Sequence, residues 1–557
     1  MSADQSADWD DSFDVIVIGS GAAGLTAAVV ADRQGLRTLV VEKEALYGGT
    51  TALSGGVAWV PNNALMQKAG LPDTPAAALT YLEHNIGNRV AHGKLAAFVE
   101  HAPKMAEFLQ AHSELAFNIV HGFPDYRPEA PGGSKGGRSI DPKVISGRKL
   151  KDFDRLRRSA TGMPGGLVGS VTEMRRLAFF KSNPMGLAKV WSFFPRNLWN
   201  KLAGRQHVSS GMALIARLRL TLQKRAVPLW LDTPLQELIV ENDTVMGVCV
   251  QREGRTKRLA ARKGVIMAAG GFERNPAMRR QFFGDQGGDD WNQGQFTSGS
   301  PGNVGDGIEA GASIGAARDL MDDMWWMPST MPPGGKPVIV VFERGLPHMM
   351  VVNAKGQRFA NEARPYNELG RLIYEEQEQP AHIIFDQEFR SKYAIGGLIP
   401  GVPAKKFIES GYLKQADSLE QLATISGVDP EGLRDTVQRF NRMAEQGRDE
   451  DFGKGESAFD LYAGDPAHRP NPCLGAIGKP PFYALQIAAG DLGTKGGLLT
   501  NEKAQVLRED GSVIPGLYAA GNSSASVMGN FYPGAGGTIG AAMTYGYIAA
   551  MDASGNN

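Results

Sequence analysis

The feature that most constrains this chain is a glycine-rich turn between two apolar strands near the N-terminus. The run DVIVIG at residues 14–19 is apolar and β-branched, which predicts a buried parallel strand. The turn GSGAAG follows at once, then residues 25–35 with helical composition, and then the apolar run RTLVVEK at residues 37–43. Strand, turn, helix and strand make a complete βαβ unit, so a Rossmann-like α/β domain is predicted.

Three glycines and one carboxylate in this unit have distinct predicted roles. Gly19 is expected to make the tight turn, Gly21 to let the backbone approach a pyrophosphate, and Gly24 to let the helix pack on the strand. The pyrophosphate would lie on the helix N-terminus. Glu42, at the end of the second strand, would accept hydrogen bonds from ribose hydroxyls. A dinucleotide site is therefore predicted, and the alternative is a glycine-rich turn that binds no nucleotide.

The stretches that follow favour FAD over NAD. YGGTTALSGG, residues 47–56, comes soon after Glu42 with no second helix between them, and its glycines and threonines can follow a dinucleotide toward a flavin. KGVIMAAGGFERN (263–275) and GLYAAGNSS (516–524) are two further glycine-rich strand ends. Together these stretches resemble the FAD enzymes of the succinate dehydrogenase and fumarate reductase flavoprotein superfamily. The resemblance implies an FAD-binding domain that another domain interrupts.

The predicted cofactor-binding residues lie in these stretches and in a C-terminal glycine-rich turn. They are Gly19, Ser20, Gly21, Ala23, Gly24, Glu42, Lys43, Gly49, Thr50, Thr51, Ser54, Gly55, Gly56, Ala269, Gly270, Gly521, Asn522, Gly537, Thr538 and Ile539. The superfamily's covalent members place a histidine near the GGTTALSGG stretch, and this chain has none there, so FAD is expected to bind non-covalently. The nine histidines show no metal-ligand spacing, so no metal site is predicted.

The order of the patterns predicts one domain inserted into another. Residues 1–324 and 489–557 would form the discontinuous Rossmann-like FAD-binding domain. Residues 325–488 would form an inserted α+β cap that covers the flavin. Within the cap, residues 348–370 (HMMVVNAKGQRFANEARPYNELG) predict two strands around a Lys-Gly turn and then a helix.

A second glycine-rich stretch, GNFYPGAGGTIG at residues 529–540, carries a tyrosine where neither helix nor strand is expected. Together with SPGNVGDGIEAGASIGAARDLMDDMWWMP (300–328) and the rest of residues 490–550, it resembles the 3-ketosteroid Δ1-dehydrogenases over nearly the whole chain. The family's YPGxG motif implies that Tyr532 and Gly536 bind the C3 carbonyl of the steroid. A tyrosine after RFxNE implies Tyr366 as base, and the FPDY loop implies Tyr126 as its support.

The implied chemistry, 1,2-desaturation of a 3-ketosteroid, explains why these groups are needed. The C2 proton beside a ketone is weakly acidic, so a hydroxyl and an amide must stabilise the carbonyl oxygen as it becomes enolate-like. A tyrosine with a pKa of about 10 is a poor base at neutral pH, so a second phenol is needed to stabilise its phenolate. The C1 hydrogen would leave as hydride to FAD, and the dipole of the helix after Gly540 would favour negative charge on the reduced flavin.

Other functions remain open at this point. A ketosteroid dehydrogenase acting at C4–C5 needs the same groups, and a flavin-containing steroid-binding protein without activity would share the fold. A fumarate-reductase-like enzyme is disfavoured because Asn522 stands where those enzymes usually carry an acidic residue. Tyr126 and Tyr366 also have a structural alternative, since most tyrosines only pack.

Composition excludes several further classes. The 59 Lys and Arg residues balance the 59 Asp and Glu residues, so no net charge favours nucleic acid. The sequence contains no run of 18 apolar residues, so no transmembrane helix is predicted. Two cysteines without a CxxC pattern and an acidic N-terminal stretch suit a cytoplasmic protein. The electron acceptor is unknown; a quinone or an artificial dye could serve.

A basic, aromatic insert at about residues 150–205 stands out in a chain of zero net charge. Residues 151–205 hold 11 Lys and Arg against 3 Asp and Glu. Six of its aromatic residues are Phe179, Phe180, Trp191, Phe193, Phe194 and Trp199. Cationic and aromatic side chains together are typical of a membrane surface, so residues 175–200 are predicted to make peripheral membrane contact. A flap packed on the FAD domain and a subunit interface are the alternatives.

Overall fold

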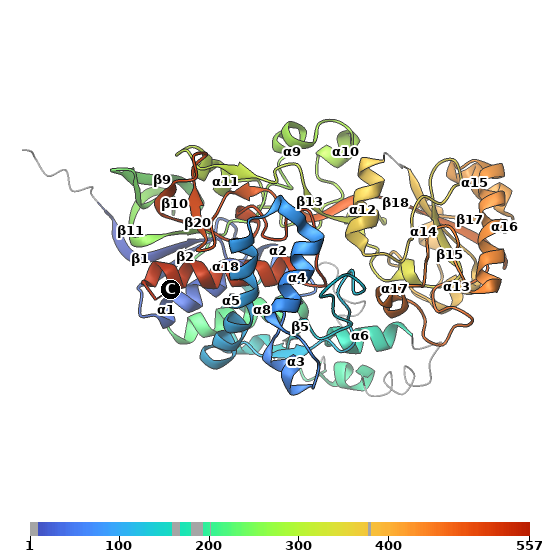
Figure 1. Ribbon diagram of the computed structural model, residues 1–557, viewed down its shortest axis with the longest axis horizontal. Coiled ribbons are helices and arrows are strands. Elements are labelled where there is room, and N and C mark those ends of the chain that lie inside the picture. Colours follow the sequence, from blue (N-terminus) through green and yellow to red (C-terminus); the bar gives the residue numbers. More distant parts are fainter. Residues whose placement is uncertain (1–8, 159–167, 180–192, 201, 377–379, 557) are drawn as a thin grey trace, which may run out of the picture.

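The chain folds around two main β-sheets (Figure 1). The structure, a computed structural model, describes residues 9–158, 168–179, 193–200, 202–376 and 380–556. In Figure 1 the sheet built on the N-terminal βαβ unit lies to the left and the second sheet to the right. The predicted α/β architecture is confirmed.

The first sheet completes the βαβ unit with strands from far along the chain. β1 (Asp11–Ile18), α1 (Ala22–Arg33) and β2 (Thr38–Val41) follow one another as predicted. β1 pairs in parallel with β2 and with β11 (Arg255–Met267), and β11 pairs in parallel with β21 (Val513–Ala519). The carboxyl ends of these parallel strands meet at one edge, which is where open α/β sheets bind ligands.

Helices pack closely on this sheet because the side chains on their contact faces are small. α1 buries its residues from Ala22 through Ala31, most of which are alanine, glycine or valine. It packs against α18 (Gly537–Ser554) and α8 (Ser210–Lys224), and α18 also packs against α5 (His92–His112). The first and last helices of the described chain are therefore neighbours (Figure 1).

The second sheet is antiparallel and lies mostly within residues 325–488. Its strands are β13 (Met324–Thr330), β14 (Val338–Ile339), β15 (Met349–Val352), β16 (Ala381–Phe385), β17 (Leu413–Ala416) and β18 (Phe482–Thr494). Its helices are α12 (Tyr366–Glu375), α13 (Gln387–Lys392), α14 (Lys405–Glu409), α15 (Leu419–Ser426), α16 (Pro430–Gln446) and α17 (Ala458–Ala463). β18 runs across the predicted boundary between residues 488 and 489, and the predicted domain division stays a proposal.

One local prediction in this region is wrong. The segment after β15 does not form a second strand; it turns through residues 353–365 and then enters α12. The reason is that Arg358 and Glu362 point inward into a buried ionic network with Asp449, which fixes the segment by side-chain bonds in place of a strand ladder.

Some of the remaining strands extend the first sheet, and the others form small separate sheets. The strands are β3 (Ala58–Trp59), β4 (Phe117–Ile119), β5 (Ser139–Pro142), β6 (Ile145–Ser146), β7 (His207–Val208), β8 (Leu229–Trp230), β9 (Leu235–Glu241), β10 (Thr244–Arg252), β12 (Arg318–Asp319), β19 (Gly497–Leu498) and β20 (Gln505–Leu507). The α-helices are α2 (Gly49–Leu53), α3 (Ala64–Lys68), α4 (Pro75–Ile86), α6 (Val171–Ala178), α9 (Pro276–Phe283), α10 (Gly288–Asn292) and α11 (Asp306–Ala312).

The basic insert is described in part. α6 and the helical residues 193–200 belong to it, whereas Phe180 and Trp191 lie outside the described residues. Phe179 and Phe193 are buried, so these two aromatics pack inside the protein. Across the described ranges, none of the helices combines the length and the apolar character that a membrane crossing requires.

Candidate cofactor and active site

A cavity lies at the edge where the parallel strands of the first sheet end. Residues from β1, α1, β2, α2 and α18 and from the segment just after β11 line it, so segments from both ends of the chain meet there. Those predicted from the sequence are Gly19, Ser20, Gly21, Ala23, Glu42, Lys43, Gly49, Thr50, Thr51, Ser54, Ala269, Gly270, Gly521, Asn522, Thr538 and Ile539.

The glycine-rich turn between β1 and α1 has the geometry of a phosphate site. Gly19 has φ of +107°, and a Cβ there would lie 2.2 Å from the carbonyl oxygen of Ala268. A Cβ on Gly24 would lie 2.0 Å from the carbonyl oxygen of Gly19, so this glycine permits helix packing and does not line the cavity. Gly21 is the N-cap of α1 and borders the cavity, so the helix N-terminus is open to an anion.

The carboxylate at the end of β2 is held in place by the same turn. The Ser20 hydroxyl donates to Glu42 Oε2 at 2.5 Å, and the amide of Glu44 donates to its Oε1 at 3.0 Å. Burial raises the pKa of Glu42, while the hydrogen bond from Ser20 opposes that effect. Glu42 is thus an oriented acceptor beside the phosphate site, which fits the ribose of a dinucleotide such as FAD.

Three other predicted glycines have packing reasons or no contact with the cavity. Gly56 has φ of +71°, and a Cβ there would lie 2.3 Å from the carbonyl carbon of Ser210. A Cβ on Gly537 would lie 2.8 Å from Cδ of Pro533. A Cβ on Gly55 would meet no other atom within 4 Å. None of the three lines the cavity as the structure describes it, and the roles assigned to the cofactor residues stay predictions.

The sequence reasoning missed a polar group on the far side of the cavity. Asn303 Nδ2 donates to Thr50 Oγ1 at 2.9 Å and to Glu273 Oε1 at 2.6 Å. Burial, reinforced by Asp491, raises the pKa of Glu273 to about 7. Other lining residues that were missed are Ile18, Ala22, Val41, Glu44, Thr233, Leu235, Ala268, Ser300, Gly302, Asp306, Gly307, Leu492 and Ala542. Counting Asn303, most of the polar ones lie in residues 300–307. In the sequence, that stretch was used only for its resemblance to a family, although its glycines and polar side chains could have indicated a binding site.

The three predicted catalytic tyrosines form one cluster, and none of them lines the cavity itself. The ring centroids are 5.6 Å apart for Tyr126 and Tyr366, 5.1 Å for Tyr126 and Tyr532, and 5.6 Å for Tyr366 and Tyr532. Tyr126 and Tyr532 are buried, and Tyr366 is partly exposed. Three distant chain segments supply them: the loop before β5, the first residue of α12 and the turn before α18.

Hydrogen bonding links these hydroxyls in series. Burial raises the pKa of each tyrosine well above its usual value. A hydrogen bond from Thr538 lowers the pKa of Tyr532, one from Tyr532 lowers that of Tyr366, and one from Tyr366 lowers that of Tyr126. Because Thr538 also lines the cofactor cavity, the series connects the cavity with the tyrosines.

The turn beside Tyr532 presents a backbone donor. Gly536 has φ of +89°, and a Cβ there would lie 2.4 Å from the carbonyl oxygen of Val57, so this position requires glycine. Its carbonyl accepts from the amide of Trp59 at 3.0 Å. Within the described chain the amide of Gly536 itself donates no hydrogen bond. A hydroxyl and a backbone N–H are therefore available side by side.

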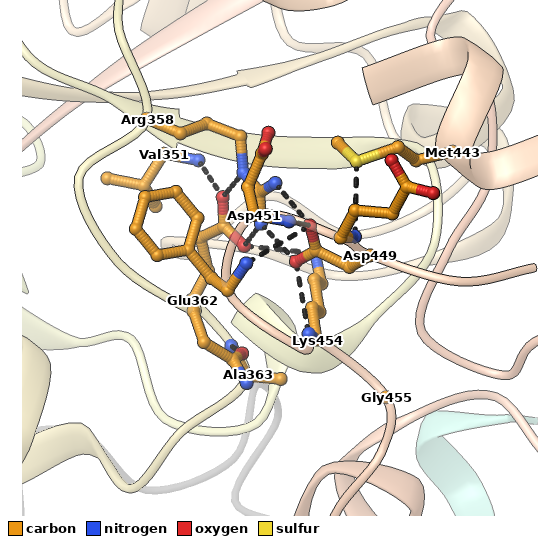
Figure 2. Close-up of polar contacts among 12 residues, drawn as sticks. Val351, Arg358, Glu362, Ala363, Met443, Asp449, Asp451, Lys454 and Gly455 are labelled. Atoms are coloured by element: carbon orange, nitrogen blue, oxygen red, sulfur yellow. Dashed lines mark hydrogen bonds and ion pairs between the residues drawn. The ribbon is translucent and has the colours of Figure 1, made fainter. Parts of the chain in front are cut away.

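A buried ionic network supports the segment that leads to Tyr366 (Figure 2). Arg358 donates to both Glu362 oxygens, at 2.7 and 3.0 Å, and to both Asp449 oxygens, at 3.0 and 2.8 Å. Lys454 Nζ lies 3.7 Å from Glu362 Oε2. Two cations and two carboxylates thus compensate one another beneath the turn, and they hold it in one position.

Comparison with known proteins identifies the class that this fold and site define. The FAD binding domain family model matches residues 14–539, which confirms FAD as the cofactor. A solved 3-ketosteroid Δ1-dehydrogenase from Sterolibacterium denitrificans, in complex with 1,4-androstadiene-3,17-dione, superimposes with a TM-score of 0.92 at 42% identity. That match covers 98% of this chain and 100% of the other. The protein is therefore an FAD-binding flavoprotein.

Curated relatives narrow the family. The 3-oxosteroid 1-dehydrogenase of Mycobacterium tuberculosis (strain ATCC 25618 / H37Rv) is 45% identical over 97% of this chain and 98% of its own length. A 4-oxocyclohexanecarboxylate 2-dehydrogenase of Sinomonas cyclohexanicum is 34% identical over 98% of this chain and 93% of its own length. The chain belongs to the 3-oxosteroid 1-dehydrogenase family.

Proposed function

We propose that this protein is an FAD-dependent 3-oxosteroid 1-dehydrogenase that removes the C1 and C2 hydrogens of 3-ketosteroids during steroid degradation. The observation that carries the proposal is the amide of Gly536, which donates no hydrogen bond within the described chain and belongs to the same turn as Tyr532, whose ring contacts Tyr126 and Tyr366. The steroid as substrate class follows from the family.

Two groups would hold the C3 carbonyl oxygen. The Tyr532 hydroxyl and the Gly536 amide belong to a turn that packs on Val57 and Trp59, so both donors would be in place before substrate arrives. Such preorganised donors stabilise charge that develops on oxygen. As the C2–H bond breaks, its electron pair delocalises toward the C3 oxygen, and the two donors would stabilise the negative charge that develops on that oxygen.

Tyr366 would take the C2 proton on its phenolate oxygen. Burial opposes formation of that phenolate, so neighbouring hydroxyls must stabilise it. Tyr126 and Tyr532 both interact with the Tyr366 hydroxyl, which makes the cluster a shared proton site. Bound FAD would accept the hydride that leaves C1.

Flavin spectroscopy with product analysis tests this function. Anaerobic addition of a 3-ketosteroid to the holoenzyme should bleach the flavin absorbance and yield the 1,2-unsaturated product. Absence of bleaching would indicate a steroid-binding flavoprotein. A product unsaturated at C4–C5 would support the related dehydrogenase instead, and oxidation of the reduced enzyme by fumarate with no steroid product would support a fumarate-reductase-like enzyme.

A peripheral membrane contact through residues 175–200 is a further part of the proposal. Phe194, Leu198 and Leu202 repeat every four residues and are 48%, 58% and 75% exposed, and Trp199 beside them is 63% exposed. Residues that repeat at this spacing share one helix face. An apolar face within a segment of net positive charge suits an anionic lipid surface, where an apolar substrate gathers.

The cellular setting completes the proposal. Cys249 and Cys473 are both free thiols, which suits a cytoplasmic protein with peripheral membrane association. A quinone is an electron acceptor that such a membrane would supply, and an artificial dye could replace it in an assay.

A further inference from the structure

Arg344 is a buried arginine whose hydrogen bonds all go to backbone carbonyls. It lies in a 3₁₀ turn, Glu343–Gly345, and is 1% exposed. Its Nε donates to the carbonyl of Val340 at 3.0 Å, and its Nη1 donates to the carbonyl of Arg364 at 3.1 Å and to that of Glu362. In the part of the chain that the structure describes, no carboxylate lies within 4 Å of its nitrogens. A buried charge without an ion pair is costly, so its presence calls for a reason.

The 3₁₀ turn touches both segments that carry the predicted base pair. The carbonyls held by Arg344 belong to Glu362 and Arg364, just before Tyr366. Phe342, at the start of the turn, packs edge-on against Phe123 with ring centroids 5.6 Å apart. Phe123 belongs to the loop that carries Tyr126. Arg344 therefore sits where the Tyr126 loop and the Tyr366 turn converge.

The carboxylates nearest to Arg344 are engaged elsewhere. Glu362 is bound by Arg358 in the network of Figure 2. Glu343 Oε2 accepts from the amide of Val341 at 2.8 Å. Asp460 Oδ2 accepts from Asn361 Nδ2 at 2.9 Å. None of the three forms an ion pair with Arg344, whose charge acts most strongly on Glu343 and Tyr126 and less on Glu362 and Asp460.

We propose that Arg344 is a positioning residue of proton abstraction, whose positive charge stabilises the phenolate shared by Tyr366 and Tyr126. The inference rests on the proposed function, because it assumes that Tyr366 is the base. A guanidinium keeps its positive charge under nearly all conditions, whereas a carboxylate or a phenol in its place would supply no positive charge to stabilise a phenolate.

The titration behaviour of the cluster agrees with this geometry. Burial lowers the pKa of Arg344 to about 10, with Glu343 opposing, so the group stays cationic at neutral pH. Burial raises the pKa of Tyr126 and of Tyr366, and Arg344 lowers both. The other groups that face the pair are Tyr532 and Tyr81, whose ionisation would raise the pKa of Tyr126. Arg344 is the cation that opposes the burial effect on both phenols.

The test is the pH dependence of kcat/KM for two neutral variants, Arg344→Gln and Arg344→Met, beside Arg344→Lys. Removing the charge should raise the pKa of the base, which moves the acid limb of the profile to higher pH by about one unit or more, a tenfold loss of rate on that limb. The loss should be recovered at alkaline pH. Arg344→Lys keeps the charge but loses the branched hydrogen bonding, so its acid limb should stay within about half a unit of wild type.

Controls separate charge from folding. Arg364→Gln removes an exposed charge from the turn that leads to Tyr366, and its pH profile should match that of wild type. FAD content and thermal melting establish that each variant folds. Tyrosinate absorbance, compared between the apoproteins of wild type and Tyr366→Phe in each background, should show the phenol of residue 366 titrating at higher pH in the neutral variants. If both neutral variants fail to bind FAD, the pH profile of Arg344→Lys tests the proposal in their place.

The proposal would be overturned if Arg344→Gln lowered kcat/KM equally at every pH and left the acid limb of the profile at its wild-type position. Arg344 would then have only a structural role. An acid limb of Arg344→Lys displaced by a full unit would also overturn the proposal. Tyr366→Phe distinguishes the two levels of inference. If that variant retains turnover, the proposed base and this role for Arg344 fail together; if it is inactive and the Arg344→Gln limb does not move, the role of Arg344 alone fails.

Discussion

Tyr532→Phe is the sharpest perturbation of the proposed carbonyl site because it removes one hydroxyl and little else. The ring packs against Trp325, Tyr126 and Tyr366, with centroids 4.9, 5.1 and 5.6 Å away, and phenylalanine keeps these contacts. The Gly536 amide would remain as the sole donor to the C3 oxygen. Loss of one such donor costs about 10²–10³ in rate, equivalent to roughly 2.7–4 kcal/mol of transition-state stabilisation.

The loss should fall on kcat, because negative charge on the C3 oxygen grows only as the C2 proton leaves. KM should change little, since apolar rings supply most of the binding energy of a steroid. Steady-state kinetics and exchange of the C2 hydrogen with solvent measure the two effects, and exchange should slow in parallel with kcat.

Tyr545→Phe is the matched control. Tyr545 is equally buried, and its hydroxyl donates to the carbonyl of Lys94 at 2.8 Å, away from the cluster. Its loss should lower stability by about 1 kcal/mol and leave kcat unchanged. A Tyr532→Phe enzyme with a many-fold higher KM and an unchanged kcat would refute the reasoning, because the hydroxyl would then bind the ground state as strongly as the transition state.

Four further outcomes are expected. FAD should be released by acid precipitation, since no histidine stands near residues 48–56; yellow colour that stays with the pellet would contradict non-covalent binding. Tyr366→Phe should lose turnover by at least about 10²–10⁴ while still binding FAD and steroid, and activity within tenfold of wild type would exclude it as general base. In wild type, kcat/KM should rise with pH through the neutral range, because burial raises the pKa of Tyr366 and only the phenolate accepts a proton; a flat profile would argue against that base. The protein should sediment with anionic liposomes at low salt, and replacement of Trp191, Phe194 and Trp199 by Ser should release it with activity on soluble substrate intact; wild type that stays in the supernatant would favour a flap or an interface.

The FAD-binding half of the molecule was predictable because its signals are local. Gly19, Gly21 and Glu42 lie within one βαβ unit, where spacing along the chain determines spacing in the fold. Glu273 and Asn303 were not predicted, because their contact with each other and with Thr50 depends on how distant loops close over the cavity. No periodicity in the sequence reports such a contact.

The cap was harder to predict for a related reason. Apolar alternation suggested a strand on each side of Gly356, yet Arg358 and Glu362 are buried as charges. Hydrophobic patterns assume that charged residues face water, and they fail where two charges bury each other. Arg344 escaped notice on the same ground, since a single arginine in a loop usually indicates a solvated surface.

The packing of α1 against α18 determines when the cofactor site can exist during synthesis. α1 and the phosphate turn are made first, whereas β21 and α18 come from residues 513–554. The N-terminal unit therefore leaves the ribosome with an apolar helix face uncovered and an open sheet edge next to β11. Contacts of such large sequence separation form slowly, so the nascent chain must survive this exposure until its last helix arrives. The FAD site, which both ends of the chain line, can thus be complete only after nearly the whole described chain has been synthesised.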